Sequence, residues 1–319
     1  MKSPLLSLPG AVPAEGPDEG VAAHYGDLFR EQRELAGGRA FTDLSHRGVI
    51  TVTGPDRLAW LHLLVTQHVS ELPAGQAAEA LVLSPHGHVE HALYLVDDGT
   101  TTWAHVEPGT QAELLAYLEK MKFMYRVEVA DATAEYAVLH LPAGHAAAPG
   151  AAAVRELPWG RDLFVPRAEL AAVAAGLGSP AGVWAHEALR IEAHRPRLGF
   201  ETDHRTIPHE VDWLRTAVHL NKGCYRGQET VARVHNLGKP PRRLVFLHLD
   251  GTEETLPPHG TELRTAADPT GRPVGFVTSS ARHWELGPIA LALVKRNTPV
   301  DGVLLAGTVP GTQDVVVEP

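Results

Sequence analysis

Short apolar runs bounded by Gly, Pro and Asp dominate the first two thirds of the chain, and a few segments of helical periodicity lie among them. The short runs predict strands at 40–45, 49–53, 80–83, 89–96, 101–106, 126–129, 136–141 and 163–166. Helical spacing predicts helices at 110–122, 167–177 and 182–194, and Gly54-Pro55-Asp56 is typical of another helix start. Because these elements interleave without a regular βαβ rhythm, the pattern favours an α+β fold over a doubly wound sheet.

The pattern changes at Lys239-Pro240-Pro241. Beyond this point lie apolar runs at 244–249, 261–264, 274–279, 289–294, 303–308 and 315–317, and none of them has a convincing helical periodicity. Many short strands separated by turn residues are typical of a β-barrel or a β-sandwich. We therefore expect an α+β region over 24–238 and a separate all-β domain over 239–319.

Residues 1–23 are rich in Pro and Gly and contain only a short apolar run, which Pro4 and Pro9 interrupt. We expect a flexible lead-in here and no secretory signal. No stretch of about 20 apolar residues occurs, so we expect no membrane-spanning helix and a cytoplasmic location. The Ala/Gly/Pro-rich segment 143–153 is expected to be a surface loop.

Composition narrows the class of protein. The 319 residues are 44% hydrophobic and 21% charged, which suits a chain with a sizeable core. Lys and Arg total 28 against 38 Asp and Glu, and this excess of negative charge disfavours strong direct binding of nucleic acid, which needs clustered cations. The single Cys excludes an intramolecular disulfide and a four-thiolate cluster held by this chain alone, and it suits a reducing compartment.

The candidate chemistry concentrates in residues 222–229, which read K-G-C-Y-R-G-Q-E. Lys222 and Arg226 place positive charge on both sides of Cys224, and positive charge stabilises a thiolate, the form that acts as nucleophile or metal ligand. The two glycines allow a sharp turn or a close approach of the backbone to a ligand. In the alternative interpretation, Cys224 is a small buried apolar residue, as free cysteines often are.

The other candidate motifs are weaker evidence for a functional site. His86, His88 and His91 suggest a zinc site, but strand alternation separates His88 from His91, so we predict a solvated hairpin and no metal site. The chain has no G-x-S-x-G, no Walker A loop and no G-x-G-x-x-G. Four tryptophans are expected to be core residues: Trp60, Trp103, Trp184 and Trp213.

Segment 222–229 resembles the K-G-C-Y-x-G-Q-E signature of the YgfZ-type folate-binding proteins. These are relatives of the glycine cleavage T-protein (aminomethyltransferase) and of a mitochondrial iron–sulfur assembly factor. Further segments are similar to the same superfamily, and they extend the resemblance from about residue 25 to the end of the chain: 43–48 (DLSHRG), 52–56 (VTGPD), 189–193 (LRIEA), 207–210 (IPHE), 275–279 (GFVTS) and 289–292 (IALA).

The resemblance implies an α+β fold in which two intertwined ferredoxin-like α+β domains and a C-terminal β-barrel form a ring. It also implies binding of tetrahydrofolate or a one-carbon derivative of it. By position, Cys224 matches the signature thiol, for which we expect a redox or transient-ligand role, and Glu192 matches the carboxylate that meets the pterin ring. The other folate-site residues that the resemblance implies are Lys222, Tyr225, Gln228, Glu229 and, for the anionic tail, Arg233.

The sequence departs from the T-protein pattern at two places. The T-protein carries an Asp pair after a Gly-rich turn, whereas this chain has Gly87-His88-Val89-Glu90-His91. The carboxylate used in aminomethyl transfer is therefore absent or replaced by Glu90. His194 stands where Gly usually follows Ala, so the local turn near the expected folate edge differs from the family pattern.

We therefore predict a tetrahydrofolate-binding accessory protein for the assembly or repair of iron–sulfur enzymes, including enzymes that modify tRNA. Its expected partners are folate and iron–sulfur client proteins, without membrane attachment. The enzymatic alternative is a folate-dependent aminomethyl- or methyltransferase of the T-protein type, which the missing Asp pair disfavours. A non-catalytic interaction scaffold is the third hypothesis, because a fold alone does not determine a function.

Overall fold

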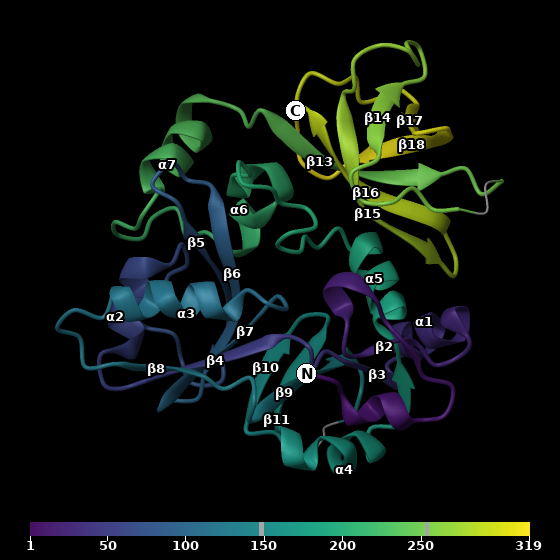
Figure 1. Cartoon of the computed structure of the whole chain (residues 1–319). Coiled ribbons are helices and arrows are strands. Elements are labelled where there is room, and N and C mark those ends of the chain that lie inside the picture. The colour runs from purple at the N-terminus through teal and green to yellow at the C-terminus, as the bar shows by residue number, and fades with distance from the viewer. Residues whose placement is uncertain (147–149, 253–254) are drawn as a thin grey trace. The chain divides into compact units, whose positions relative to one another are not determined.

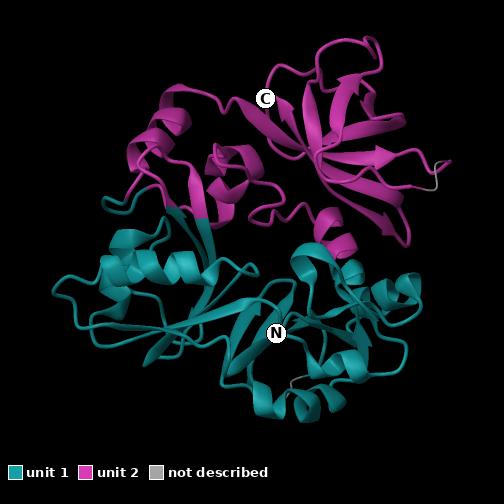
Figure 2. Cartoon of the chain, viewed as in Figure 1, with its two compact units in different colours: residues 1–82, 91–186, 221–225 teal, residues 83–90, 187–220, 226–319 magenta. Residues whose placement is uncertain are grey.

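The structure is a computed structural model that describes residues 1–146, 150–252 and 255–319. The chain divides into two compact units (Figure 2). Unit 1 comprises residues 1–82, 91–186 and 221–225, and unit 2 comprises residues 83–90, 187–220 and 226–319. The chain therefore crosses between the units after residues 82, 90, 186, 220 and 225. Within the described residues, no helix is long and apolar enough to cross a membrane.

The first sheet of unit 1 has the strand order β5-β6-β7-β4-β8 (Figure 1). Its strands are β4 (Gly48–Thr53), β5 (Ala77–Leu83), β6 (Val89–Asp97), β7 (Thr101–Val106) and β8 (Glu128–Asp131). Helices α2 (Arg57–Leu64) and α3 (Gln111–Lys120) share a core with this sheet, in which Ile50, Trp60 and Leu114 are buried. Trp60 is held there by a hydrogen bond from its Nε1 to the carbonyl oxygen of Met121 at 2.9 Å.

The second sheet of unit 1 has the order β10-β11-β9-β3-β12, and β12 runs parallel to β3. Its strands are β3 (Ala40–Asp43), β9 (Tyr136–Pro142), β10 (Ala153–Leu157), β11 (Gly160–Pro166) and β12 (Ser179–Ala181). Helix α1 (Leu28–Ala36) packs beside β12, while α4 (Leu170–Ala175) follows the 3₁₀ turn η3 (Arg167–Glu169). The loop expected over 143–153 ends at β10, and residues 147–149 within it lie outside the described residues.

The prediction of a flexible lead-in over residues 1–23 is wrong. This segment forms η1 (Pro4–Ser7), β1 (Val12–Pro13), η2 (Gly16–Asp18) and β2 (Ala22–His24). Leu5 is buried in the core of the second sheet, and the Ser3 hydroxyl donates a hydrogen bond to Asp43 at 2.5 Å. The apolar residues between the prolines thus find a partner far along the chain, which local composition does not reveal.

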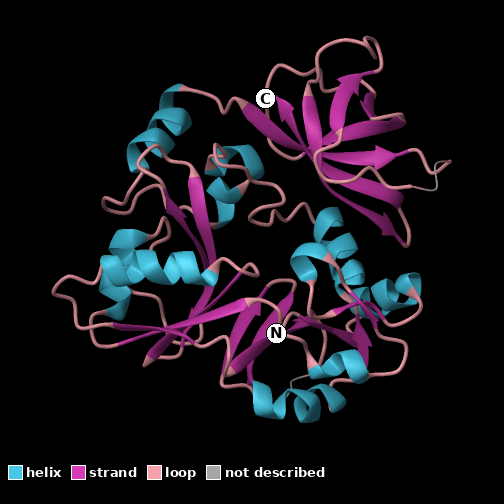
Figure 3. Cartoon of the chain, viewed as in Figure 1, coloured by secondary structure: helices cyan, strands magenta, loops and turns pink. Residues whose placement is uncertain are grey.

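Unit 2 contains a closed barrel with the strand order β13-β16-β15-β14-β17-β18. The strands are β13 (Arg242–Leu249), β14 (Glu262–Thr265), β15 (Gly275–His283), β16 (Gly287–Lys295), β17 (Leu304–Ala306) and β18 (Val309–Val315). Figure 3 shows the mixture of helices and strands in unit 1 and the all-β character of this barrel. The expected C-terminal β-barrel is therefore confirmed. The apolar run predicted at 303–308 contains β17, whereas the run predicted at 315–317 overlaps β18 only at Val315; a tight turn joins these two strands.

Unit 2 does not begin at the predicted boundary of residue 239. It also includes the end of α5 (Val183–Glu192), η4 (Pro208–Val211), α6 (Trp213–Thr216) and α7 (Gln228–Leu237). Polar side chains explain the difference: Arg190 donates to Ser279 Oγ on β15 at 2.8 Å, and Arg242 on β13 donates to Glu210 Oε2 at 2.9 Å. These bonds attach the segment after α5 to the barrel strands.

Three of the four tryptophans expected in the core are buried: Trp60, Trp103 and Trp213. Trp184 is an exception, because 52% of it is exposed. The buried stripe of α5 runs instead through Ala185 and Ala188, and the Trp184 ring lies against the ring of His24 with a centroid separation of 5.4 Å.

Candidate functional site

Lys222 anchors the first half of the K-G-C-Y-R-G-Q-E segment inside unit 1. Its ammonium group donates hydrogen bonds to the carbonyl oxygens of His62, Val65 and Gln67, the last at 3.3 Å. These carbonyls lie at and just beyond the C-terminal end of α2, where helix carbonyls have no partner within the helix and a cation is favourable. Only 5% of Lys222 is exposed, and burial lowers the pKa of its ammonium group to about 8.

Tyr225 is the second anchor of this loop. It is buried, and the Lys222 Nζ lies 5.1 Å from the centroid of its ring, within the range of a cation–π contact. Burial raises the pKa of the Tyr225 hydroxyl to about 12, so the phenol stays protonated at neutral pH. Cys224 lies between the two anchors and is exposed. The alternative in which Cys224 is a buried apolar residue is therefore wrong.

The second half of the segment lies in unit 2 and is shaped by Gly227. This residue precedes α7 with φ +82°, and a Cβ there would lie 2.5 Å from the carbonyl oxygen of Ser84. In the hairpin turn before β6, Gly87 has φ +80°, and a Cβ there would lie 2.7 Å from the Cβ of Thr230 on α7. The turn and the start of α7 thus pack closely enough that only glycine fits at both positions.

Glu90 forms an ion pair with Arg226 in unit 2, with Nη1 and Oε2 3.0 Å apart. Each side chain is about one third exposed, at 33% for Arg226 and 37% for Glu90. Arg226 stands at the variable position of the K-G-C-Y-x-G-Q-E signature, and Glu90 stands in the stretch where a T-protein has its Asp pair. This carboxylate is therefore held by a cation of the same unit. Within the described residues, no group of three or more His, Cys, Asp or Glu residues is placed to hold a metal ion.

Glu192 is the last residue of α5, and 46% of its side chain is exposed. Its Oε2 lies 3.7 Å from Nε2 of His283, which is buried at the end of β15. An exposed carboxylate of this kind has two oxygens with which to accept hydrogen bonds from a ligand. The pterin-binding role expected for Glu192 stays a prediction.

The remaining predicted residues lie on α7 in unit 2. Gln228 is the first residue of the helix and is half-buried, whereas Glu229 and Arg233 are exposed. The predicted site residues therefore divide between the two units. Lys222, Cys224 and Tyr225 belong to unit 1, while Glu192, Gln228, Glu229 and Arg233 belong to unit 2.

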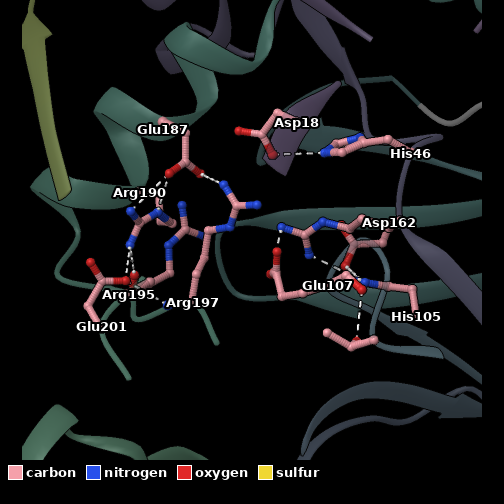
Figure 4. A network of polar contacts seen from close by, with 12 residues as sticks. Asp18, His46, His105, Glu107, Asp162, Glu187, Arg190, Arg195, Arg197 and Glu201 are labelled. Atoms are coloured by element: carbon pink, nitrogen blue, oxygen red, sulfur yellow. Dashed lines mark hydrogen bonds and ion pairs between the residues drawn. The ribbon is translucent and has the colours of Figure 1, made fainter. Parts of the chain in front are cut away.

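A buried ion-pair network, which the sequence did not indicate, fixes the end of α5 (Figure 4). Glu187 pairs with Arg190 at 2.9 Å and with Arg197 at 3.0 Å, and Arg190 also pairs with Glu201 at 2.9 Å. Glu201 in turn accepts a hydrogen bond from the Ser279 hydroxyl on β15 at 2.5 Å. The network joins α5 to β15, the two elements that carry Glu192 and His283.

A second buried network, also absent from the predictions, joins the two sheets of unit 1 (Figure 4). Asp162 on β11 contacts His105 on β7 at 3.1 Å, His140 on β9 at 2.8 Å and Arg155 on β10 at 2.9 Å. These partners hold the pKa of Asp162 well below its usual range, and burial lowers the pKa of His105 to about 4. The network accounts for four buried polar or charged side chains that periodicity does not assign.

His194 adopts φ +55° directly after α5. The backbone N–H of His194 donates a hydrogen bond to the carbonyl oxygen of Ile191 at 3.0 Å. The backbone N–H of Arg195 donates to the carbonyl oxygen of Arg190 at 3.1 Å. Helices often end in this way, with a left-handed residue that is usually Gly. The position where the family pattern has Gly is therefore a left-handed helix end, and His194 adopts the same conformation.

The comparisons with known proteins agree with this architecture. Residues 24–154 match the protein family described as the GCVT N-terminal domain. The structure of the glycine cleavage system aminomethyltransferase T from Bartonella henselae has the same fold, with a TM-score of 0.80 and 19% identity over 98% of this chain and 94% of that one. The N-terminal part of the chain is thus similar to this family, and most of the chain is similar in sequence to proteins named as aminomethyltransferases. The α+β fold with its C-terminal barrel is confirmed by the likeness to the solved structure.

Curated proteins of similar sequence include aminomethyltransferases and an iron–sulfur cluster assembly factor. An "Aminomethyltransferase" from Moorella thermoacetica is 27% identical over 320 residues, covering 88% of this chain and 85% of the relative. Another from Thermus thermophilus is 29% identical over 290 residues, covering 80% and 79%. The "Iron-sulfur cluster assembly factor IBA57 homolog, mitochondrial" from Mycosarcoma maydis is 25% identical over 303 residues, covering 79% and 73%.

Proposed function

We propose that this protein, which is similar to aminomethyltransferases, is a tetrahydrofolate-binding accessory protein for the assembly or repair of iron–sulfur enzymes, including enzymes that modify tRNA. The observation that carries the proposal is the presentation of Cys224. The thiol is exposed on a loop whose neighbours, Lys222 and Tyr225, are both buried and in contact with each other. A loop fixed at both sides of one exposed thiol suits a thiol that acts on a partner.

The folate part of the proposal rests on Glu192. The N–H edge of a reduced pterin offers two donors, and the exposed carboxylate of Glu192 offers two acceptors on one group. Arg233 is an exposed cation for the anionic tail, and Gln228 and Glu229 supply further polar contacts on α7. Bound tetrahydrofolate supplies a carrier of one-carbon units.

The iron–sulfur part rests on Cys224 and on the relative from Mycosarcoma maydis, which is named as an iron–sulfur cluster assembly factor. Iron–sulfur clusters are commonly held by four thiolates, so one thiol serves as a transient ligand or redox group while a client protein supplies the rest. Lys222 takes part indirectly, because its ammonium group is bonded to the carbonyls at the end of α2.

A folate-dependent aminomethyltransferase is the second candidate, because most of the matched relatives described above carry that name. The pairing of Glu90 with Arg226 disfavours it, since the carboxylate in the T-protein's Asp stretch is engaged by a cation. Transfer of a methylene group from an amine donor to tetrahydrofolate by the purified protein would establish this activity and displace the accessory role.

The first experiment is equilibrium binding of tetrahydrofolate under anaerobic conditions, followed by tryptophan fluorescence. We expect saturable one-to-one binding that Glu192→Ala weakens and that Glu113→Ala, at an exposed glutamate in the first turn of α3, leaves unchanged. Absence of binding up to millimolar folate would refute the folate role and favour the scaffold hypothesis.

The second experiment tests the thiol in cells that lack the native gene, with the activity of an iron–sulfur enzyme as readout. Cys224→Ser changes one exposed atom, so the protein should fold as before and fail to restore that activity. Full restoration by Cys224→Ser would refute a role for the thiol. Ala112→Ser, at another exposed residue, controls for the effect of an added hydroxyl.

A further inference from the structure

The His283 ring is fixed in one tautomer by the turn that joins β15 to β16. The backbone N–H groups of Glu285 and Leu286 both donate to its Nδ1, at 3.3 Å and 3.1 Å. A backbone N–H only donates, so Nδ1 must be the unprotonated acceptor. The proton of the neutral ring is therefore on Nε2.

This Nε2–H group is buried and has no hydrogen-bond partner within the described residues. His283 itself is only 3% exposed. The group faces the carboxylate of Glu192, whose Oε2 is 3.7 Å away, just beyond hydrogen-bond distance. A buried donor without an acceptor is unfavourable, and a small rotation of the half-exposed Glu192 side chain supplies the acceptor.

The two side chains lie on elements that are already locked together. Glu192 ends α5 and His283 ends β15, and Arg190 joins these elements through its bond to Ser279 at 2.8 Å. His283 therefore has a fixed position, a fixed ring orientation and a fixed proton, whereas Glu192 keeps its side-chain freedom. The fixed His283 ring can therefore orient the Glu192 carboxylate.

We propose that His283 is a positioning residue for Glu192, and that it donates from Nε2 to Oε2 so that the carboxylate faces a ligand with its remaining lone pairs. Each carboxylate oxygen can accept two hydrogen bonds, so this contact leaves acceptors on both oxygens. A ligand edge with two adjacent N–H donors fits that arrangement. The identity of this ligand as a folate rests on the proposed function, but the pairing itself does not.

The pairing is tested first without any ligand, by nitrogen-15 NMR of the histidine side chains. His283→Asn identifies the His283 signals by their loss. The charged groups that act on this ring are Glu192 on α5 and Glu285 in the following turn, and both raise the pKa of His283 against the lowering effect of burial. The ring of Trp284 also faces it, with a centroid separation of 6.0 Å.

We expect Glu192→Gln to lower the pKa of His283 and to shift its Nε2 resonance. Glu285→Gln removes a nearby charge that is not aimed at Nε2, so it should lower the pKa with a smaller Nε2 shift. Equal Nε2 shifts in both variants, or none in Glu192→Gln, would overturn the pairing.

The second arm measures tetrahydrofolate binding. In His283→Asn the side-chain oxygen still accepts from the turn while the Nε2 donor is lost, so we expect about tenfold weaker binding, which corresponds to ~1.4 kcal/mol. The double variant with Glu192→Gln should bind no more weakly than Glu192→Gln alone, and His283→Gln, which restores a donor, should recover part of the affinity. Additive losses would refute the positioning role. If the unmodified protein binds no folate, the proposed function fails while the NMR result still decides the pairing.

Discussion

The two glycines of the K-G-C-Y-R-G-Q-E segment should respond very differently to replacement by alanine. Gly227 has φ +82°, and its Cβ would lie 2.5 Å from the Ser84 carbonyl oxygen and 3.0 Å from the Cα of Gly87. Gly223, four residues earlier, does not have a left-handed φ, and nothing lies within 4 Å of the position of its Cβ. The same substitution therefore meets backbone at one position and open space at the other.

The magnitudes follow from these two environments. A left-handed conformation costs an L-residue about 1–2 kcal/mol. Forcing a methyl group into packed backbone adds about 1–3 kcal/mol. We therefore expect Gly227→Ala to lower the free energy of unfolding by about 2–5 kcal/mol. Gly223→Ala should change it by less than about 1 kcal/mol, in the stabilising direction if the native conformation suits alanine.

Urea unfolding, followed by circular dichroism and tryptophan fluorescence, measures both variants against the unmodified protein. Gly87→Ala serves as a further check, because its Cβ would collide with Thr230 across the same contact. Losses of similar size for Gly223→Ala and Gly227→Ala would refute the reasoning. So would a Gly227→Ala protein of unchanged stability, because the close contact between the hairpin turn and α7 would then be unnecessary.

Three further predictions concern stability. His194→Gly should be more stable than His194→Ala by about 1 kcal/mol, because both lose the ring and only alanine keeps the left-handed strain at φ +55°; urea unfolding that shows equal stabilities would contradict this. Lys222→Met should cost about 1–3 kcal/mol, because it leaves the carbonyls at the end of α2 without their buried donor; a thermal melt identical to that of the unmodified protein would count against the anchor. Burial lowers the pKa of His209 to about 4. Between pH 6.5 and 4 the unfolded chain therefore binds a proton that the folded chain does not. The free energy of unfolding should fall as the pH drops through this range. His209→Leu should reduce that slope in denaturation curves measured at several pH values, and an unchanged slope would rule out this residue as its source.

Elements defined by local pattern were predictable from the sequence. Strand β7 and helix α3 follow directly from alternation and from the spacing of Leu114 and Leu118, which are fully buried. The barrel strands β13 to β17 also follow, since turn residues mark their ends, whereas most of β18 lies outside the run predicted at 315–317. In each case the signal and the structure that it specifies lie within the same few residues.

Contacts between distant segments could not be predicted in this way. Asp162 meets His105 at a separation of 57 residues, and Arg190 meets Ser279 at a separation of 89. A single sequence shows each of these side chains as an ordinary polar residue in a strand or helix. The ordered segment 1–23 and the extension of unit 2 beyond the barrel depend on the same kind of pairing, which local pattern does not reveal.

For the candidate site, the resemblance nominated residues, and their roles stay predictions. Cys224 and Glu192 were identified by resemblance, and the structure leaves both exposed, as an interaction with a ligand or partner requires. Lys222 was identified with them, yet its contacts are with the end of α2. The donor of His283 had no signal in the sequence, because a tautomer is set by backbone geometry.

The path of the chain between its units has a consequence for synthesis on the ribosome. Lys222 reaches back to the carbonyl of His62, which precedes it by 160 residues, so the first unit lacks this contact until residue 222 has left the ribosome. Nascent chains usually fold their N-terminal domain first, as soon as it is complete. Here the segment that completes unit 1 is translated after residues 187–220, which belong to unit 2. The exposed thiol of Cys224 therefore reaches its final setting only when most of the polypeptide has been made.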